Sequence, residues 1–276
     1  MQFPIEDPVS FFSKYLQLTG VAHLGPELHG DPRLLGKRLG LINGSAWVML
    51  WSYYFGRLYL PGVHLVNVGN EAVQLNFMQA YSEGKSGPPA ANIERFVCYA
   101  RDLVELAQVD AVLITCSTMN RSYNAVMEAV AGDGVPVVQI DQPMIETAVK
   151  LGGRILVIAT HGPTVTSTQA LLVEIASQMG REPVYTGVTV EEAWHCLAAG
   201  DVTGHNQVVA DAIKSTIERD NYSCVVLAQL SMSTFLFSYP EPETVFDLPV
   251  LTSGQYGFER IRTLLSTSPS SSGTTT

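Results

Sequence analysis

The chain has 276 residues, of which 46% are hydrophobic, and this is enough to bury a large core in one large domain or two lobes. Its net charge is −10, and it contains no basic run or stripe of basic and aromatic side chains, so its composition argues against a nucleic-acid partner. The amino terminus lacks the basic and apolar parts of a secretion signal, and no apolar run reaches membrane-spanning length. We therefore expect a cytoplasmic protein with reduced thiols and no membrane partner.

Residues 1–37 are predicted to form an extension with one short amphipathic helix at 9–16. From Arg38 onward, short apolar strands alternate with helical stretches, which is typical of a parallel sheet. The strongly aromatic segment 47–56 follows the first strand, and its rings either pack a helix on the sheet or, for one or two of them, line a pocket. The expected strands of this first half are 38–43, 63–68, 111–114 and 135–141.

The same pattern begins again at residue 154, and this internal duplication is the strongest sign of how the chain is organised. It predicts an α/β fold with two pseudo-symmetric Rossmann-like lobes, each with a parallel sheet, and a cleft between their strand ends. The expected strands of the second half are 154–159, 182–186, a strand within 223–232, and 249–254. The expected boundaries are 38–142 for the first lobe, 143–254 for the second, 255–265 for a helix that completes the first lobe, and 266–276 for a disordered tail.

Cys116 stands in a polar turn, Thr-Cys-Ser-Thr-Met-Asn, directly after the expected strand 111–114. In open α/β sheets the ligand binds outside the carboxyl ends of the strands, and amides that open a helix there suit a carboxylate. A thiol beside such an anion site can act as an acid, a base or a nucleophile. Alternatively, Cys116 is a small buried hydrophobe, as free cysteines often are. The four cysteines show no ligand spacing, so we expect no metal site.

Polar side chains at other strand ends complete an expected pocket for a small carboxylate or carbonyl substrate. His161 follows the first strand of the second half and is the best candidate for a second acid or base, because the reference pKa of histidine is about 6.5. A loop histidine that faces solvent is the alternative. The residues expected to bind substrate are Asn43, Ser45, Ser117, Thr118, Asn120, Thr160, Gln229, Leu230 and Ser231.

These motifs resemble those of the aspartate/glutamate/hydantoin racemase superfamily. The resemblance covers residues 38–265 and rests on the paired lobes, the Ile-Thr-Cys-Ser-Thr-Met-Asn turn, Val-Ile-Ala-Thr in the second lobe and Val-Leu-Ala-Gln-Leu-Ser-Met near the end. Members include amino-acid racemases, hydantoin racemases, maleate isomerase and arylmalonate decarboxylase. The resemblance implies an enzyme without a cofactor, a homo-oligomer, and, for the racemases, two cysteines on opposite faces of the reacting carbon.

The chain departs from the racemase pattern in its second lobe. Cys116 matches the first cysteine, but the alignment of 110–119 with 223–232 puts Gln229 at the second position, and an amide moves no proton near neutral pH. Cys224 lies about five residues from the far end of its strand, at ~3.3 Å per residue, which is too far to replace it. Three hypotheses follow: an isomerase or racemase that acts beside a carboxylate or carbonyl, a decarboxylase or carbon–carbon lyase with Cys116 as proton donor, and a binding protein without catalysis.

Overall fold

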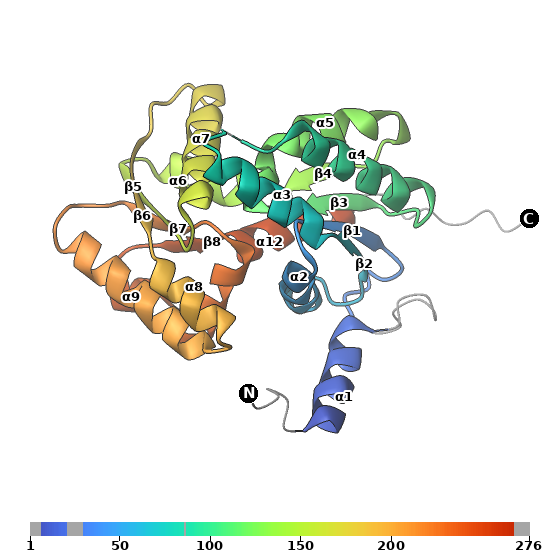
Figure 1. The fold of residues 1–276 in the computed structure, drawn as a ribbon, viewed down its shortest axis with the longest axis horizontal. Helices are drawn as coiled ribbons and strands as arrows, with labels where there is room; N and C mark the ends of the chain where they lie inside the picture. The colour runs from blue at the N-terminus through green and yellow to red at the C-terminus, as the bar shows by residue number, and fades with distance from the viewer. Residues whose placement is uncertain (1–6, 21–29, 86, 268–276) are drawn as a thin grey trace, which may run out of the picture.

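The computed structural model describes residues 7–20, 30–85 and 87–267. It contains two four-stranded parallel sheets, with the strand orders β2-β1-β3-β4 and β6-β5-β7-β8. The strands are β1 (Arg38–Asn43), β2 (His64–Gly69), β3 (Ala111–Ile114), β4 (Val137–Gln139), β5 (Arg154–Ala159), β6 (Val184–Thr189), β7 (Cys224–Leu227) and β8 (Val250–Thr252). Figure 1 shows the two sheets in neighbouring lobes, each among its own helices, so the predicted two-lobed α/β fold is confirmed.

Helices connect the successive strands of both lobes. The helices of the first half are α1 (Pro8–Thr19), α2 (Ala46–Tyr59), α3 (Glu71–Ser82), α4 (Ala90–Glu105) and α5 (Tyr123–Ala129), with short 3-10 turns η2 (Ser117–Ser122) and η3 (Ala131–Asp133). Those of the second half are α6 (Gln142–Leu151), α7 (Gly162–Gln178), α8 (Glu191–Ala198), α9 (Val202–Ile217), α10 (Phe235–Ser238), α11 (Glu243–Phe246) and α12 (Ser253–Thr267), with the 3-10 turn η4 (Leu230–Thr234).

Each sheet is buried on both faces, which explains why its strands are apolar throughout. All four residues of β3 are fully buried, as expected for a central parallel strand. Helices α2 and α12 pack on one face of the first sheet, and α4 and α5 pack on the other. In the second lobe α6 and α7 cover one face, and α8 and α9 cover the other. Four cores therefore hold the strand ends in place.

Two helices pack on the sheet of the opposite lobe. Helix α6 follows the last strand of the first sheet, yet its Ile145 lies in a core of the second lobe. Helix α12 follows the last strand of the second sheet, and its Phe258 lies in a core of the first lobe. The two helices also contact one another, with Arg260 Nη2 2.6 Å from Glu146 Oε2. This exchange fixes the orientation of the two lobes, and hence the shape of the cleft between them.

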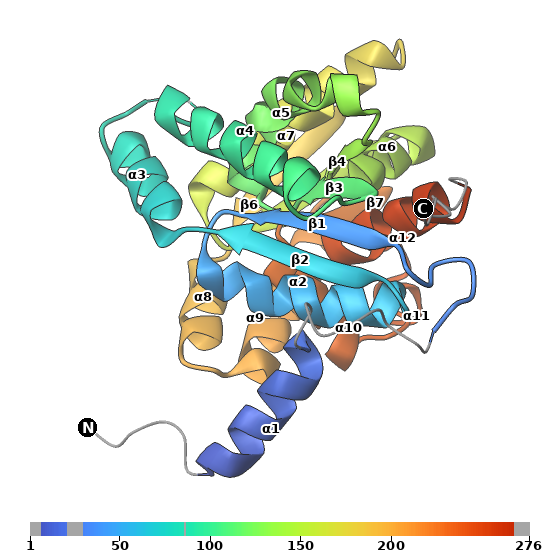
Figure 2. The same cartoon turned by 90° about the vertical axis from the view of Figure 1, so that its right-hand side faces the viewer.

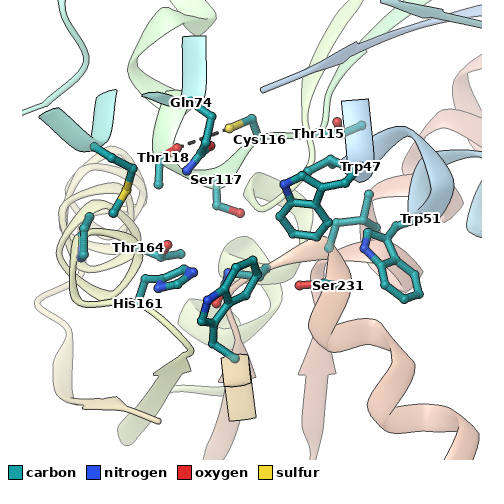
Figure 3. A pocket seen from close by; sticks show the side chains of 16 residues that line it. Trp47, Trp51, Gln74, Thr115, Cys116, Ser117, Thr118, His161, Thr164 and Ser231 are labelled. Atoms are coloured by element: carbon teal, nitrogen blue, oxygen red, sulfur yellow. Dashed lines mark hydrogen bonds between the residues drawn. The ribbon is translucent and has the colours of Figure 1, made fainter. Parts of the chain in front are cut away.

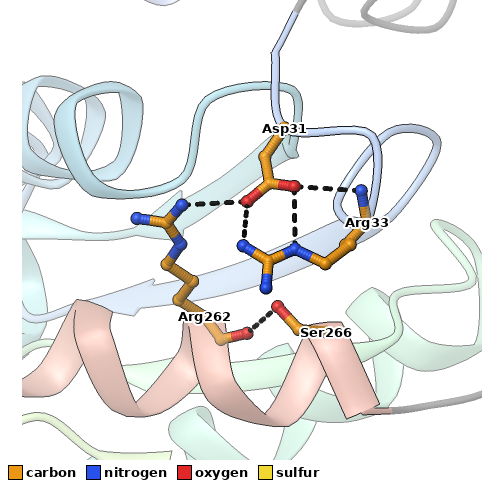
Figure 4. Close-up of polar contacts among 4 residues, drawn as sticks. All are labelled: Asp31, Arg33, Arg262 and Ser266. Atoms are coloured by element: carbon orange, nitrogen blue, oxygen red, sulfur yellow. Dashed lines mark hydrogen bonds and ion pairs between the residues drawn. The ribbon is translucent and has the colours of Figure 1, made fainter.

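The segment before β1 is fastened to the last helix by an ion-pair cluster (Figure 4). Asp31 accepts hydrogen bonds from Arg33 of its own segment at 2.7 Å and from Arg262 of α12 at 2.8 Å. The hydrogen bonds from these two guanidinium groups hold the pKa of the Asp31 carboxyl well below its usual range. Helix α1 extends away from the sheets and contacts α2, as Figure 2 shows, where Arg57 Nε donates to the carbonyl oxygen of Leu18.

The structure corrects several element boundaries. Strand β6 runs over Val184–Thr189 rather than 182–186, because its register with β5 begins where Val184 pairs with Arg154. Strand β4 spans Val137–Gln139 and is shorter than the expected 135–141; beyond it, the backbone amides of residues 141 and 142 donate to the side-chain oxygen of Gln139. Helix α12 continues to Thr267, and residues 268–276 of the predicted tail lie outside the described residues. Within the described ranges, no helix has the length and apolar character needed to cross a bilayer.

Candidate active site

A cavity of about 290 Å³ lies between the lobes, at the carboxyl ends of their central strands. This is the edge where ligands bind in open α/β sheets. Turns that follow β3 and β7 line it, together with residues of four helices. The lining residues are Trp47, Val48, Trp51, Gln74, Met78, Thr115, Cys116, Ser117, Thr118, His161, Pro163, Thr164, Trp194, Gln229, Leu230 and Ser231.

Cys116 reaches this cavity from the end of β3 and is 8% exposed. Its Sγ lies 3.3 Å from Oγ1 of Thr118, and the pair lies on one side of the cavity in Figure 3. The thiol has room because residue 44 is a glycine: a Cβ on Gly44 would stand 2.5 Å from Sγ. The strand therefore delivers the thiol into a space that the neighbouring strand end leaves open.

The surroundings of Cys116 keep its thiol protonated. Burial is the largest influence and raises the pKa of the Cys116 thiol above its ordinary value. Hydrogen bonds from the Thr118 hydroxyl and from the amides of Met119 and Thr118 act in the opposite direction, because they favour the thiolate. The buried carboxyl of Asp141 raises the pKa further. Cys116 is thus a proton donor at neutral pH, with hydrogen-bond donors ready for the thiolate that it would leave.

His161 comes from the second lobe, at the amino-terminal cap of α7. Figure 3 places it across the cavity from Cys116. The imidazole packs against the indole of Trp194, with ring centroids 4.7 Å apart. Burial lowers the pKa of the His161 imidazole below its ordinary value, and Glu191 only partly offsets this. The histidine is therefore neutral at pH 7, and its free ring nitrogen can accept a proton.

Gln229 occupies the position in the second lobe that Cys116 holds in the first. In the sheets, Ile114 pairs with Ile42 and Leu227 pairs with Ile158, so Cys116 and Gln229 each stand two residues beyond an equivalent pair. The Oε1 atom of Gln229 accepts the backbone amide of Thr160 at 2.6 Å and the Thr160 hydroxyl at 2.8 Å. The predicted alignment of the two halves thus agrees with the strand register.

Aromatic and aliphatic side chains make up much of the cavity wall. Trp47 of α2 and Trp194 of α8 meet across the cleft, with ring centroids 5.5 Å apart. Trp51 also lines the cavity, so it contains all three tryptophans of the chain. Among the described residues, no lysine, arginine or carboxylate lines it. No three His, Cys, Asp or Glu side chains in the described part of the chain come together as metal ligands would.

Several residues predicted to bind substrate instead make contacts within the fold. Asn43 is fully buried, donates to the carbonyl oxygen of Val68 and accepts from Thr115. Asn120 exchanges hydrogen bonds with Ser167 of α7 and thereby joins the lobes. Of the predicted set, the structure brings Cys116, His161, Ser117, Thr118, Gln229, Leu230 and Ser231 together in the cavity lining, while Asn43, Ser45, Asn120 and Thr160 lie outside it.

Sequence reasoning missed several lining residues. Gln74 and Met78 come from α3, and Thr164 comes from the first turn of α7. Trp194 lies on α8, five residues after the end of β6, just as Gln74 lies five residues after the end of β2. The available signal was the same for all three helices, because α3, α7 and α8 each begin directly after a strand, namely β2, β5 and β6.

The family model of Asp/Glu/Hydantoin racemase matches residues 80–261, which is more than half of the chain. The chain belongs to this family. It is thus an enzyme of the racemase superfamily, within the isomerase class. A comparison with curated proteins finds no match.

Solved structures of racemases share this fold. Allantoin racemase from Klebsiella pneumoniae is 16% identical, with a TM-score of 0.57 over 84% of this chain and 88% of that one. Aspartate racemase from Picrophilus torridus is 14% identical, with a TM-score of 0.58 over 83% of this chain and 94% of the other. Glutamate racemase from Francisella tularensis is 16% identical, with a TM-score of 0.57 over 83% and 81%. At such identities the likeness shows the fold and leaves the substrate open.

Proposed function

We propose that this enzyme is a cofactor-independent isomerase that moves a proton at a carbon beside a carbonyl or carboxylate group. One observation carries the proposal: a thiol and an imidazole, one from each lobe, line opposite sides of one cavity. Burial raises the pKa of the Cys116 thiol and lowers the pKa of the His161 imidazole. Near neutral pH the pair therefore consists of an acid and a base, which is the state that proton transfer to and from one carbon requires.

The proposed reaction has two proton transfers. His161 takes the proton from the reacting carbon, and the electron pair of the C–H bond moves to the neighbouring oxygen to give an enolate. Cys116 then gives its thiol proton to the same carbon from the other side, which inverts the configuration. The products of one turnover are the inverted substrate, an imidazolium and a thiolate, and proton exchange with solvent restores the starting pair.

The cavity favours a small substrate with one carboxylate or carbonyl group and an apolar, preferably aromatic, substituent. Trp47 and Trp194 offer ring faces to such a substituent. A substrate with two carboxylates would call for a cation, and no lysine or arginine of the described residues lines the cavity. The residues that line the cavity therefore argue against acidic amino acids as substrates.

The same apolar wall supports a second candidate function, decarboxylation. A carboxylate that is poorly solvated against indole rings loses carbon dioxide more readily, because the charge disperses as the bond breaks. The electron pair of that bond would form the enolate, and the Cys116 thiol would protonate the carbon. This reaction needs one proton donor and no base, so it makes no use of His161.

An exchange experiment in heavy water tests the proposal and separates the two candidates. Single enantiomers of benzylhydantoin and α-phenylpropionate are followed for deuterium incorporation and loss of optical rotation, and methylphenylmalonate is followed for carbon dioxide release. We expect exchange with inversion, and a decrease of about 10²- to 10⁴-fold in Cys116→Ala. Cys98→Ala is the matched control, because Cys98 is exposed and outside the cavity.

The outcomes differ clearly. Exchange that survives Cys116→Ala at the wild-type rate contradicts the proposal. Release of carbon dioxide from the malonate, without exchange in the other two compounds and with full dependence on Cys116, assigns the lyase reaction instead.

A further inference from the structure

The orientation of the Gln229 amide is fixed by its partner. A backbone N–H can only donate, so the atom of Gln229 that lies 2.6 Å from the Thr160 nitrogen must be the amide oxygen. The Thr160 hydroxyl donates to the same oxygen at 2.8 Å. The amide NH₂ group of Gln229 therefore points away from Thr160, and the side chain cannot flip without losing both hydrogen bonds.

This NH₂ group has no acceptor among the described residues. Gln229 is half-buried and lines the cavity, so its two N–H bonds are available to a ligand. The hydroxyl of Ser231, two residues further on, likewise bonds to no described residue and also lines the cavity. Figure 3 shows the Ser231 oxygen directed into the cavity. The strand end of the second lobe thus presents two neutral donors.

From these contacts we infer that Gln229 Nε2 and Ser231 Oγ bind the oxygen of the substrate on which negative charge builds up, either a carboxylate or the enolate oxygen. The inference rests on the proposed function and names the ligand chemistry of that site. Fixed donors stabilise such charge strongly, because they need no reorganisation when the charge forms. Thr160 is the positioning residue, since it holds the amide oxygen away from the ligand.

Binding of the substrate oxygen by Gln229 explains how the site can use a glutamine where the racemase pattern has its second cysteine. In the first lobe the equivalent side chains, Cys116 and Thr118, bond to one another, and the thiol proton is the reactive group. In the second lobe the equivalent side chains leave their donors free for a ligand. One strand end would transfer the proton, and the other would hold the oxygen that receives the electron pair.

Binding of phenylacetate and phenylacetamide tests the inference without any reaction. All three tryptophans line the cavity, so tryptophan emission reports its occupancy. Gln229→Glu keeps an oxygen acceptor for both Thr160 bonds and replaces the NH₂ donor by a second oxygen. We expect this variant to bind phenylacetate at least about tenfold more weakly than wild type, since a hydrogen bond to a charged group is lost. Phenylacetamide, whose own NH₂ can donate to the new oxygen, should keep or improve its affinity.

Gln74→Glu is the control for charge alone. Gln74 lines the cavity from α3, so this variant adds the same negative charge on another wall. Three outcomes would overturn the inference. They are an equal loss of affinity for phenylacetate in the two variants, a parallel loss of affinity for phenylacetamide in Gln229→Glu, and no saturable binding of phenylacetate to wild type. Ser231→Ala removes only a hydroxyl, so it should weaken the binding of phenylacetate less than Gln229→Glu does. No proton moves in these titrations. They can therefore support the inference even if the exchange experiment contradicts the proposed function, and the exchange experiment can support the proposed function even if the titrations contradict the inference.

Discussion

The two lobes share one backbone arrangement and differ in the side chain that follows the central strand of each sheet. In each lobe, a residue just after one central strand (β3 or β7) contacts the residue directly after the neighbouring central strand (β1 or β5). In the first lobe the contact joins Cys116 to Gly44, and in the second it joins Gln229 to Thr160. Glycine leaves space for a thiol, whereas threonine offers two donors to an amide. Symmetry of the fold therefore does not imply symmetry of the chemistry, which the residues of the site decide.

The largest expected effect on the exchange rate comes from removing His161, the base that the second lobe supplies. His161→Gln should lower exchange with inversion by about 10²- to 10⁴-fold, because the amide accepts no proton from carbon near neutral pH. The measurement is deuterium incorporation into a single enantiomer of benzylhydantoin. His195→Gln is the control, since His195 is exposed on α8 and outside the cavity lining. A rate that stays near wild type would leave Cys116 as the sole acid and base and would contradict the role proposed for His161.

Filling the space beside the thiol should have the next largest effect. A Cβ on Gly44 would stand 2.5 Å from Sγ of Cys116, so Gly44→Ala must displace the thiol. A displacement of about 1 Å can cost roughly 10²-fold in rate, and we expect a loss of that order. Gly132→Ala is the matched control, because nothing lies within 4 Å of a Cβ at that position. Equal rates in the two variants would show that the thiol does not need the space Gly44 provides.

The fold could be predicted because its signals are local or repeated. Short buried strands such as 111–114 show their burial in their own composition, and the duplicated pattern predicts two lobes with a parallel sheet each. Register follows as well, since aligning the two halves already puts Gln229 opposite Cys116, as the structure does. These features depend on spacing along the chain, which the sequence contains.

The cavity lining was less predictable, because it depends on which way a side chain turns and on which helix meets the cleft. Asn43 lies at a strand end, as predicted, yet its amide turns into the sheet and bonds to Val68. Asn120 follows Cys116 closely, but it serves the contact with Ser167 of the other lobe. Trp194 of α8 meets Trp47 of α2 across the cleft, and these two helices are far apart in the sequence. Such contacts join segments distant in sequence, and no local pattern indicates them.

The pH dependence follows from the opposite shifts of the two groups. Because the pKa of His161 is lowered from 6.5 and that of Cys116 is raised from 9.0, both stay in their active forms between these values. The kcat/KM for exchange should therefore be flat from pH 6.5 to pH 9 and fall by about tenfold per unit below the lowered pKa of His161. The acidic limb should vanish in His161→Gln while the basic limb remains. A profile that changes within the flat region would contradict the assignment of the base or the acid.

A smaller effect, on ligand affinity, is expected from changing the tryptophan contact between the lobes. Trp194→Leu removes the ring that contacts both Trp47 and His161 but keeps an apolar side chain. An aromatic contact contributes about 0.5–1.5 kcal/mol, so phenylacetate should bind roughly two- to tenfold more weakly, while acetate should change little. Isothermal titration gives both affinities without relying on tryptophan emission. Equal changes for the two acids would show that the ring does not contact the substituent.

The smallest effect on rate should come from the polar contact behind the reactive turn. The hydroxyl of Ser167 on α7 shares its one proton between the carbonyl oxygen of Ser117 at 3.1 Å and Asn120 Oδ1 at 3.0 Å, and so it fastens the second lobe to the turn that holds Cys116. Ser167→Ala removes both hydrogen bonds and should lower the free energy of unfolding by about 1–2 kcal/mol, measured by urea denaturation. The exchange rate should fall less than about tenfold, because the strand and Gly44 still place the thiol. A loss in rate as large as that of Gly44→Ala, with unchanged stability, would mean that the second lobe sets the position of Cys116 directly.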